Sequence, residues 1–197
     1  MKIKNLKIPG VYLIEPNIFK DDRGFFLETY RKDILDKFGI KEFLQQNQSR
    51  SIRGVLRGLH YQQVDPQGKL VRCSRGEIFD VAVDIRKGSR FFGQWIGEIL
   101  NDINHYQLWI PPGFAHGFLV LSELADVCYS CTKYYSPEKE RGIKWNDEDL
   151  KINWPISKIN TELILSKKDM GLKSLKDQIG YLPNFKEFKT LDNSSLQ

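Results

Sequence analysis

Alternation of apolar and polar positions predicts a chain built mainly of β-strands. The clearest case is residues 78–85, where apolar side chains alternate with a second set that includes Asp80 and Asp84. The apolar face of this segment consists of Phe79, Val81, Val83 and Ile85.

Further strands are expected at residues 107–110, 118–121 and 127–135. Turn signals separate them, because Gly and Pro residues interrupt the apolar runs at 87–89, 111–113 and 136–137. Several short strands at this spacing predict a β-sandwich or barrel.

Helical periodicity occurs in only two segments. Residues 31–38 place Ile34, Leu35 and Phe38 on one face, and Gly39 follows as a stop signal. Residues 168–179 place Leu172, Leu175 and Ile179 at helical spacing. Short helices flanking a β fold are therefore expected.

The 197 residues are enough for one domain with a substantial core. We expect a single domain at 1–183 and a polar, frayed C-terminal tail at 184–197. The formal net charge of +5 permits an anionic ligand, but the lysines are spread along the chain and no nucleic-acid-binding signature occurs, so no nucleic-acid partner is expected.

Cysteine usage favours a reducing, cytoplasmic setting. The chain has three cysteines, which cannot all pair, and no paired framework. Cys128 and Cys131 have the spacing of a redox or zinc motif, but they lie in a predicted strand without a second pair, so we interpret them as structural. No signal peptide and no membrane span are expected.

Candidate chemistry concentrates in residues 57–72. His60 is one of three histidines in the chain and is close in sequence to Arg57, Lys69 and Arg72. A group that titrates near neutral pH among permanent cations suits an anionic substrate that must lose a proton.

Strand geometry raises a difficulty for this cluster. Arg57 and His60 should point to opposite faces of a regular strand. A bulge at Gly58 would bring both side chains to one side.

A β-barrel with histidines also raises the alternative of a metal-dependent cupin. Such a site needs three or four His and carboxylate ligands, usually with two histidines close in sequence. His60 and His116 are far apart, and His105 lies in a polar turn and is expected at the surface. Neither a metal nor another cofactor is therefore expected.

The longer motifs resemble those of the dTDP-4-dehydrorhamnose 3,5-epimerase family, which are metal-free cupin-type enzymes. Examples are Arg57-Gly58-Leu59-His60 and Ser166-Lys167-Lys168-Asp169. The matching segments are residues 22–28, 45–49, 55–62, 67–73, 76–86, 108–118, 129, 134–137, 145–147 and 166–169. The resemblance implies a cupin-type jelly-roll β-barrel with short flanking helices.

The implied reaction inverts C3 and C5 of dTDP-4-dehydro-6-deoxy-D-glucose, in dTDP-L-rhamnose biosynthesis. Both C–H bonds are α to the C4 ketone, so each breaks through an enolate. This chemistry needs a base on one face of the sugar, an acid on the other, and a donor for the enolate oxygen.

The resemblance assigns four catalytic positions. His60 matches the base, Asp169 its carboxylate partner, Tyr129 the acid, and Lys69 the lysine near the C4 oxygen. From the local pattern alone, Tyr129 is a packed strand residue, Lys69 a solvated strand-edge residue and Asp169 a helix-start residue.

The resemblance also implies substrate contacts and a homodimer in which the segment with Arg23 and Glu28 completes the neighbouring subunit's site. The implied substrate contacts are Arg23, Glu28, Gln45, Asn47, Arg57, Lys69, His116, Glu140 and Lys168. Two other functions stay open: a monofunctional 3- or 5-epimerase of a related nucleotide sugar, and a catalytically silent sugar-nucleotide-binding cupin.

Overall fold

The computed structural model describes residues 1–188, and most of its regular elements are strands, as predicted. The strands are β1 (Lys2–Asn5), β2 (Tyr12–Glu15), β3 (Ile18–Asp21), β4 (Gly24–Leu27), β5 (Gln45–Ile52), β6 (Leu56–Gln62), β7 (Lys69–Arg75), β8 (Glu77–Asp84), β9 (Trp95–Asn101), β10 (Gln107–Ile110), β11 (Phe114–Val120), β12 (Leu124–Cys131) and β13 (Glu140–Gly142). The helices are α1 (Lys32–Leu35), α2 (Lys167–Met170) and α3 (Leu175–Gln178). Single 3₁₀ turns are η1 (Asp36–Phe38), η2 (Pro137–Lys139), η3 (Ile156–Lys158), η4 (Ile179–Tyr181) and η5 (Phe185–Phe188).

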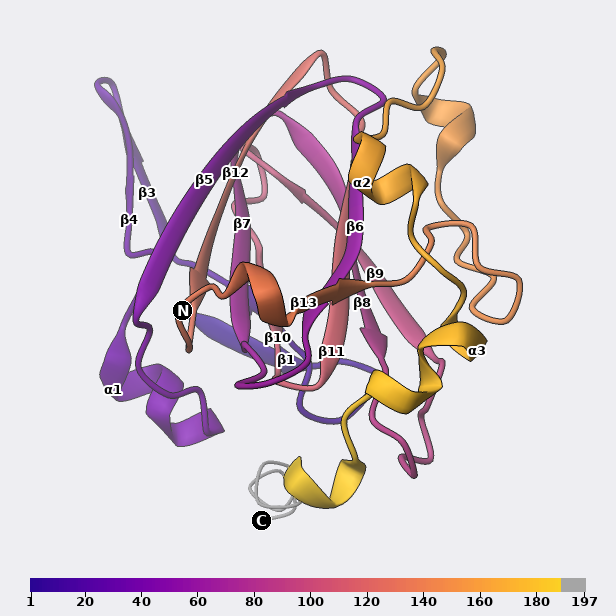
Figure 1. Cartoon of the computed structure of the whole chain (residues 1–197). Helices are drawn as coiled ribbons and strands as arrows, with labels where there is room; N and C mark the ends of the chain where they lie inside the picture. Colours follow the sequence, from indigo (N-terminus) through magenta and orange to yellow (C-terminus); the bar gives the residue numbers. More distant parts are fainter. Residues whose placement is uncertain (189–197) are drawn as a thin grey trace.

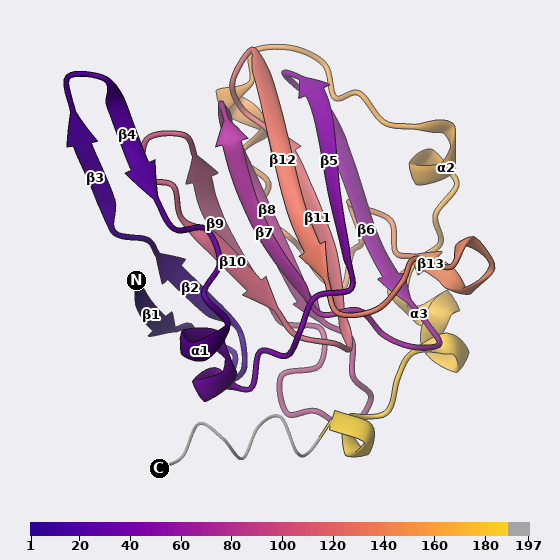
Figure 2. The same cartoon turned by 90° about the vertical axis from the view of Figure 1, so that its left-hand side faces the viewer.

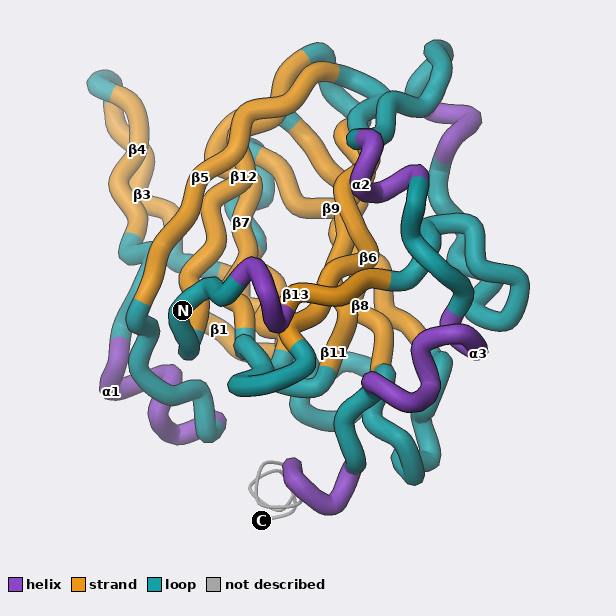
Figure 3. Tube along the Cα trace, viewed as in Figure 1, coloured by secondary structure: helices purple, strands orange, loops and turns teal. Residues whose placement is uncertain are grey.

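Two antiparallel sheets form the body of the protein (Figures 1 and 2). The first has the order β1-β2-β10-β7-β12-β5, and the second has the order β13-β6-β11-β8-β9. One apolar core lies between them, with Val71 and Val127 from the first sheet and Ile78 and Phe118 from the second. The short helices lie at the periphery of the two sheets (Figure 3).

The second sheet is buried on both faces, so both sets of alternating side chains in β8 are buried. Its Val81 and Val83 pack on the outer face of the sheet with Trp154 and Leu175 from the C-terminal third of the chain. The alternating side chains, including Asp80, are also buried. A polar residue in such a strand needs an internal partner, which makes the carboxylate of Asp80 a candidate member of a polar site.

The predicted strands are confirmed, with corrected ends. The segment at 107–110 coincides with β10, and the segment at 118–121 is the last part of the longer β11 (Phe114–Val120). The segment at 127–135 belongs to β12, which ends at Cys131. The residues that follow leave the sheet and lead into η2, so Tyr134 and Tyr135 are loop residues.

One predicted helix is confirmed and the other is wrong in extent. Residues 31–38 form α1 and η1, and Gly39 ends them with a left-handed φ of 72°. Residues 168–179 form two separate helices, α2 and α3, instead of one. The serines Ser166 and Ser174 each cap a helix N-terminus, and Gly171 ends α2, so two start signals divide the apolar periodicity.

The first part of the predicted tail is not frayed. Asn184 pairs with Lys87, and the side chain of Phe188 is buried. Residues 189–197 of that predicted tail lie outside the described part. Within residues 1–188, no helix has the length and apolar character needed to cross a membrane.

Candidate active site

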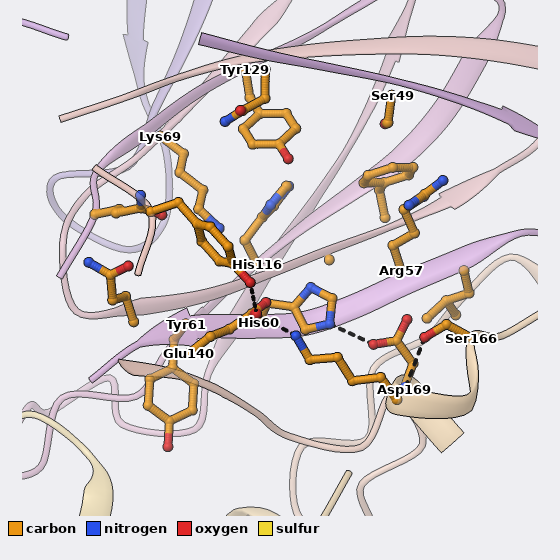
Figure 4. A pocket seen from close by; sticks show the side chains of 18 of the residues that line it. Ser49, Arg57, His60, Tyr61, Lys69, His116, Tyr129, Glu140, Ser166 and Asp169 are labelled. Carbon is orange, nitrogen blue, oxygen red and sulfur yellow. Dashed lines mark hydrogen bonds and ion pairs between the residues drawn. The ribbon is translucent and has the colours of Figure 1, made fainter. Parts of the chain in front are cut away.

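A cavity of about 630 Å³ opens between the two sheets. Strands of both sheets and helix α2 contribute side chains to it (Figure 4). Its polar lining includes Gln45, Asn47, Ser49, Arg57, His60, Gln62, Gln67, Lys69, His116, Tyr129, Tyr135, Glu140, Ser166, Lys168 and Asp169. Every predicted site residue is in this set except Arg23 and Glu28.

On one side of the cavity, His60 of β6 contacts the carboxylate of Asp169 in α2. The His60 Nε2 lies 2.6 Å from Asp169 Oδ1. Asp169 is only 4% exposed, and its backbone N–H donates to the Ser166 hydroxyl, the N-cap of α2. Burial would raise the pKa of the Asp169 carboxyl, but the hydrogen bond and charge of His60 lower it overall. An ionised aspartate therefore holds the imidazole in one orientation.

As predicted, a bulge at Gly58 of β6 places Arg57 and His60 on the same side of the strand. His60 is opposite His116 of β11, whereas Arg57 is opposite Phe118, so three steps along β6 match two along β11. Gly58 has a φ of 118°, and a Cβ there would lie 2.6 Å from the Cα of Gly117. Only glycine fits this backbone approach.

Tyr129 faces the cavity from β12 of the opposite sheet. Its hydroxyl points into the cavity, toward the side where His60 lies (Figure 4). Burial raises the pKa of the Tyr129 phenol above its ordinary value. The phenol therefore stays protonated at neutral pH and can donate a proton.

Lys69, the first residue of β7, extends into the cavity between these two groups (Figure 4). Burial lowers the pKa of its ammonium, and the nearby acidic groups of Cys131, Glu140 and Asp80 only partly offset this effect. An ammonium at this position can donate to an oxyanion that forms in the cavity.

A second histidine–carboxylate pair lies on the same sheet as His60. His116 Nε2 is 2.7 Å from Asp80 Oδ1, and both side chains are buried. The other carboxylate oxygen of Asp80 is buried without a hydrogen-bond partner in the part of the chain that the structure describes.

Glu140 collects polar contacts at the edge of the cavity. The Tyr135 hydroxyl donates to Glu140 Oε2 at 2.5 Å, and the Lys168 ammonium contacts the same oxygen. Burial would raise the pKa of Glu140, but Lys168, Tyr135 and the charge of His60 lower it. The hydrogen bond to Glu140 in turn raises the pKa of Tyr135 to about 12.

Polar side chains of β5 line the opposite wall. The Gln45 amide donates to Asn47 at 2.9 Å, and the Ser51 hydroxyl accepts from Arg57 Nε and Nη2 at 3.1 and 3.0 Å. Arg57 has no carboxylate partner within residues 1–188. A guanidinium placed in this way suits an anionic ligand.

Arg23 and Glu28 are remote from this cavity. Arg23 lies at the tip of the β3–β4 hairpin, which projects from the body of the protein (Figures 1 and 2). Its side chain is 90% exposed and, within residues 1–188, forms an ion pair only with Asp21. Glu28 follows β4 and forms an ion pair with Arg31 at 3.7 Å.

Six polar residues of the site were not predicted as site members: Ser49, Gln62, Gln67, Tyr135 and Ser166 of the cavity lining, and Asp80, which contacts His116. Asp80 could have been found as a polar residue inside an otherwise apolar strand, and Ser166 as a cap three residues before Asp169. The surface position predicted for His105 is wrong, because the residue is 9% exposed and its ring lies 4.6 Å from that of Phe25.

Residues 1–188 contain no group of three or more His, Cys, Asp or Glu side chains arranged to hold a metal ion. The histidines near the cavity, His60 and His116, each contact one carboxylate instead. The donor set of the cavity therefore fits proton transfer and anion binding.

Comparison with known proteins agrees with this geometry. The sequence model of dTDP-4-dehydrorhamnose 3,5-epimerase matches residues 5–177. A dTDP-4-dehydrorhamnose 3,5-epimerase of Pseudomonas aeruginosa is 53% identical over 179 residues, covering 90% of this chain and 97% of that protein.

Solved structures give the same result. A dTDP-6-deoxy-D-glucose-3,5-epimerase of Legionella pneumophila, in complex with dTDP-4-keto-L-rhamnose, has a TM-score of 0.89 and 49% identity over 93% of this chain and 97% of that one. A 3'-monoepimerase of Streptomyces bikiniensis, in complex with dTDP-quinovose, has a TM-score of 0.87 and 32% identity over 98% and 99%. The predicted cupin-type fold is thereby confirmed, and the chain belongs to the dTDP-4-dehydrorhamnose 3,5-epimerase family.

Proposed function

We propose that this chain is an isomerase that epimerises C3 and C5 of dTDP-4-dehydro-6-deoxy-D-glucose to give dTDP-4-dehydro-L-rhamnose. The observation that carries the proposal is the placement of His60, paired with Asp169 of α2, and of Tyr129 on different sheets that share one cavity. The identity of about one half to epimerases with this name supports the substrate.

In the proposed mechanism, the imidazole nitrogen of His60 that does not contact Asp169 removes the proton α to the C4 ketone. The C–H electron pair forms the C=C bond of an enolate, and the carbonyl electrons move to the C4 oxygen. The resulting imidazolium is stabilised by the ionised carboxylate of Asp169.

Lys69 donates to the C4 oxygen while negative charge develops there. The phenol of Tyr129 then gives its proton to the same carbon from the opposite face, which inverts the centre. The phenolate of Tyr129 and the imidazolium of His60 return to their starting states by proton exchange with solvent. One cycle at each carbon gives the L-sugar.

The nucleotide diphosphate is proposed to bind along the polar wall. Arg57, which has no carboxylate partner within residues 1–188, supplies its guanidinium to the diphosphate, while Gln45 and Asn47 of β5 supply amide groups. His116, Glu140 and Lys168 complete the substrate contacts inside the cavity.

We propose a homodimer with an isologous interface. The β3–β4 hairpin supports this, because it extends from the body and exposes three aromatic side chains, Phe19, Phe25 and Phe26, by 59%, 58% and 66%. In the dimer, Arg23 and Glu28 would reach the diphosphate and nucleotide in the partner's cavity.

A cytoplasmic location and the absence of a bound metal or cofactor complete the proposal. The three free thiols in the described part of the chain support a reducing compartment. Proton transfer alone accounts for the reaction, which involves no oxidation, reduction or hydride transfer.

Proton NMR of the dTDP-4-keto sugar in D₂O tests the function directly. Deuterium at both C3 and C5, with formation of the L-sugar, supports the 3,5-epimerase. Deuterium at one carbon alone would identify a monofunctional epimerase, the alternative favoured by the similarity to the 3'-monoepimerase. Absence of exchange would leave only a sugar-nucleotide-binding protein.

A further inference from the structure

Asp80 and His116 form a buried pair on the cavity face of the second sheet. In the register of β8 and β11, Asp80 is opposite Phe118 and His116 is opposite Ala82, so the two side chains are diagonal neighbours on one face. Their contact of 2.7 Å joins Asp80 Oδ1 to His116 Nε2. The side chains of His116 and Asp80 are 8% and 0% exposed, so the packed strands fix the orientation of the ring.

His116 has one ring nitrogen that this contact does not use. Within residues 1–188, Nδ1 has no hydrogen-bond partner, and His116 lines the cavity (Figure 4). An ionised carboxylate only accepts hydrogen bonds, so the nitrogen that contacts Asp80 carries the ring hydrogen. In a neutral imidazole the other nitrogen then has a free lone pair. His116 therefore offers a hydrogen-bond acceptor to a ligand in the cavity.

The position of His116 relative to His60 indicates which part of a sugar it meets. His116 is directly opposite His60 in the pairing of β11 with β6, and facing side chains in such a pair have Cβ atoms about 4.5–5.5 Å apart. Both residues line the same cavity. A sugar carbon that gives its proton to His60 therefore brings its neighbouring carbon within reach of His116.

The sugar of the proposed substrate has free hydroxyl groups only on C2 and C3. C1 carries the diphosphate, C4 is a ketone, C5 is bonded to the ring oxygen, and C6 is a methyl group. The C3 hydroxyl changes direction when C3 is inverted, whereas C2 keeps its configuration. An acceptor fixed on a packed strand can therefore hold only the C2 hydroxyl through both epimerisations.

We propose that Asp80 holds His116 in the tautomer with hydrogen on Nε2, so that Nδ1 accepts a hydrogen bond from the C2 hydroxyl of the substrate sugar. Asp80 is a positioning residue, because it acts through His116. The pair makes the site selective for sugars that have the C2 hydroxyl over their 2-deoxy forms. The C2 contact rests on the proposed function, whereas the tautomer of His116 does not.

Nitrogen NMR of the histidine rings tests the tautomer without substrate. The full chain, labelled at its three histidines, is measured at about pH 8.5, where an ordinary imidazole is neutral, and His116→Gln assigns the signals. The expected result is hydrogen on Nε2 in the wild type and a mixture of tautomers in Asp80→Asn, whose amide can donate or accept. Asp80→Leu can do neither, and it serves if the asparagine variant does not fold or keeps its carbonyl toward the ring.

Two NMR results would overturn the role of Asp80. The first is hydrogen on Nδ1, or on both nitrogens, in the wild type, because Nδ1 would then be a donor. The second is an unchanged tautomer of His116 in the folded asparagine and leucine variants, because another group would then fix the ring.

Kinetics with the 2-deoxy form of the substrate test the C2 contact. The wild type should show a KM about ten-fold higher for the 2-deoxy sugar, the size of one lost hydrogen bond. Asp80→Asn should raise KM for the 2-hydroxy sugar by a similar factor and leave KM for the 2-deoxy sugar nearly unchanged. The variant should hardly alter kcat, because the C2 hydroxyl is bound equally before and after proton removal. The intrinsic effect of the C2 oxygen on C3 acidity is the same in every variant and cancels in this comparison.

The matched control is Asp126→Asn on the other sheet. Asp126 is also a buried aspartate, but its carboxylate contacts Arg50 at 2.7 Å and does not line the cavity, so the variant should change neither the tautomer nor the selectivity. Equal losses with both sugars in Asp80→Asn would overturn the C2 contact. The expected tautomer in a wild-type chain that exchanges deuterium into neither sugar would retain the role of Asp80 and reject the proposed function.

Discussion

His60 Nε2 and Asp169 Oδ1 lie 2.6 Å apart although the two residues are 109 positions apart in the chain. Strand β6 supplies the histidine, and a one-turn helix capped by Ser166 supplies the carboxylate. Because Asp169 is buried and ionised, it fixes the imidazole and stabilises its protonated form. The pair is therefore expected to act as one base.

The first prediction concerns that base. His60→Ala should abolish hydrogen exchange at C3 and C5 alike, with a loss of about 10²- to 10⁴-fold, because the same group serves both carbons. The measurement is deuterium incorporation by NMR. Since the alanine variant leaves buried Asp169 without its donor, His60→Asn is the control that keeps an N–H toward the carboxylate. Undiminished exchange in either folded variant would reject the assignment of His60.

The second prediction concerns pH and Asp169. The carboxyl has a lowered pKa in the folded protein, so its ionised form stabilises the fold above the ordinary aspartate pKa. This contribution is lost as pH falls through the lowered folded pKa. The wild type should therefore exceed Asp169→Asn in free energy of unfolding most strongly at pH 6 to 7, and the difference should shrink below about pH 4. Urea unfolding at a series of pH values measures it, and a pH-independent difference would contradict the ionised pair.

Local pattern predicted the strands well because alternation follows directly from the pleat. It failed at 168–179, where helical periodicity continues across Gly171 and Ser174 although the caps require two helices. It also failed at His105, whose polar neighbours suggested a surface turn while the ring packs on Phe25 of a distant hairpin.

The active site was predictable only in part. Gly58 indicated the bulge that brings Arg57 and His60 to the same side of β6, because few other residues permit a bulge of this geometry. The pairing of His60 with Asp169 depends on the path of more than a hundred intervening residues, and no local spacing encodes it. That pair was expected from the family resemblance alone.

The third prediction concerns metal. Dialysis against a chelator should leave the epimerisation rate unchanged, because His60 and His116 are each committed to one carboxylate and no third ligand joins them among residues 1–188. Initial rates before and after dialysis provide the measurement. Loss of activity that Zn²⁺, Fe²⁺ or Mn²⁺ restores would overturn the metal-free mechanism.

The fourth prediction concerns the hairpin. If Arg23 completes the partner's site, Arg23→Ala and His60→Ala chains should both be weak alone. Their purified heterodimer contains one site with both native residues, so it should recover about half of the wild-type activity. Co-expression with two affinity tags yields the heterodimer, and a doubly tagged wild-type dimer is the control. A heterodimer as inactive as its parents would place Arg23 in the site of its own chain instead of the partner's site.

The last prediction concerns the acid. Tyr129→Phe removes one hydroxyl and keeps the ring; because no hydrogen bond from that hydroxyl occurs within residues 1–188, packing should change little. His60 on the other sheet and its partner Asp169 in α2 stay intact, so proton removal and return on the His60 face continue. The variant should therefore incorporate deuterium at C3, C5 or both while forming far less L-sugar, by about 10²-fold or more. NMR of the sugar in D₂O reports isotope and configuration together. Formation of the L-sugar at the wild-type rate would make Tyr129 a packing residue, and the donor would then be sought at Tyr135, whose hydroxyl contacts Glu140 in the same cavity.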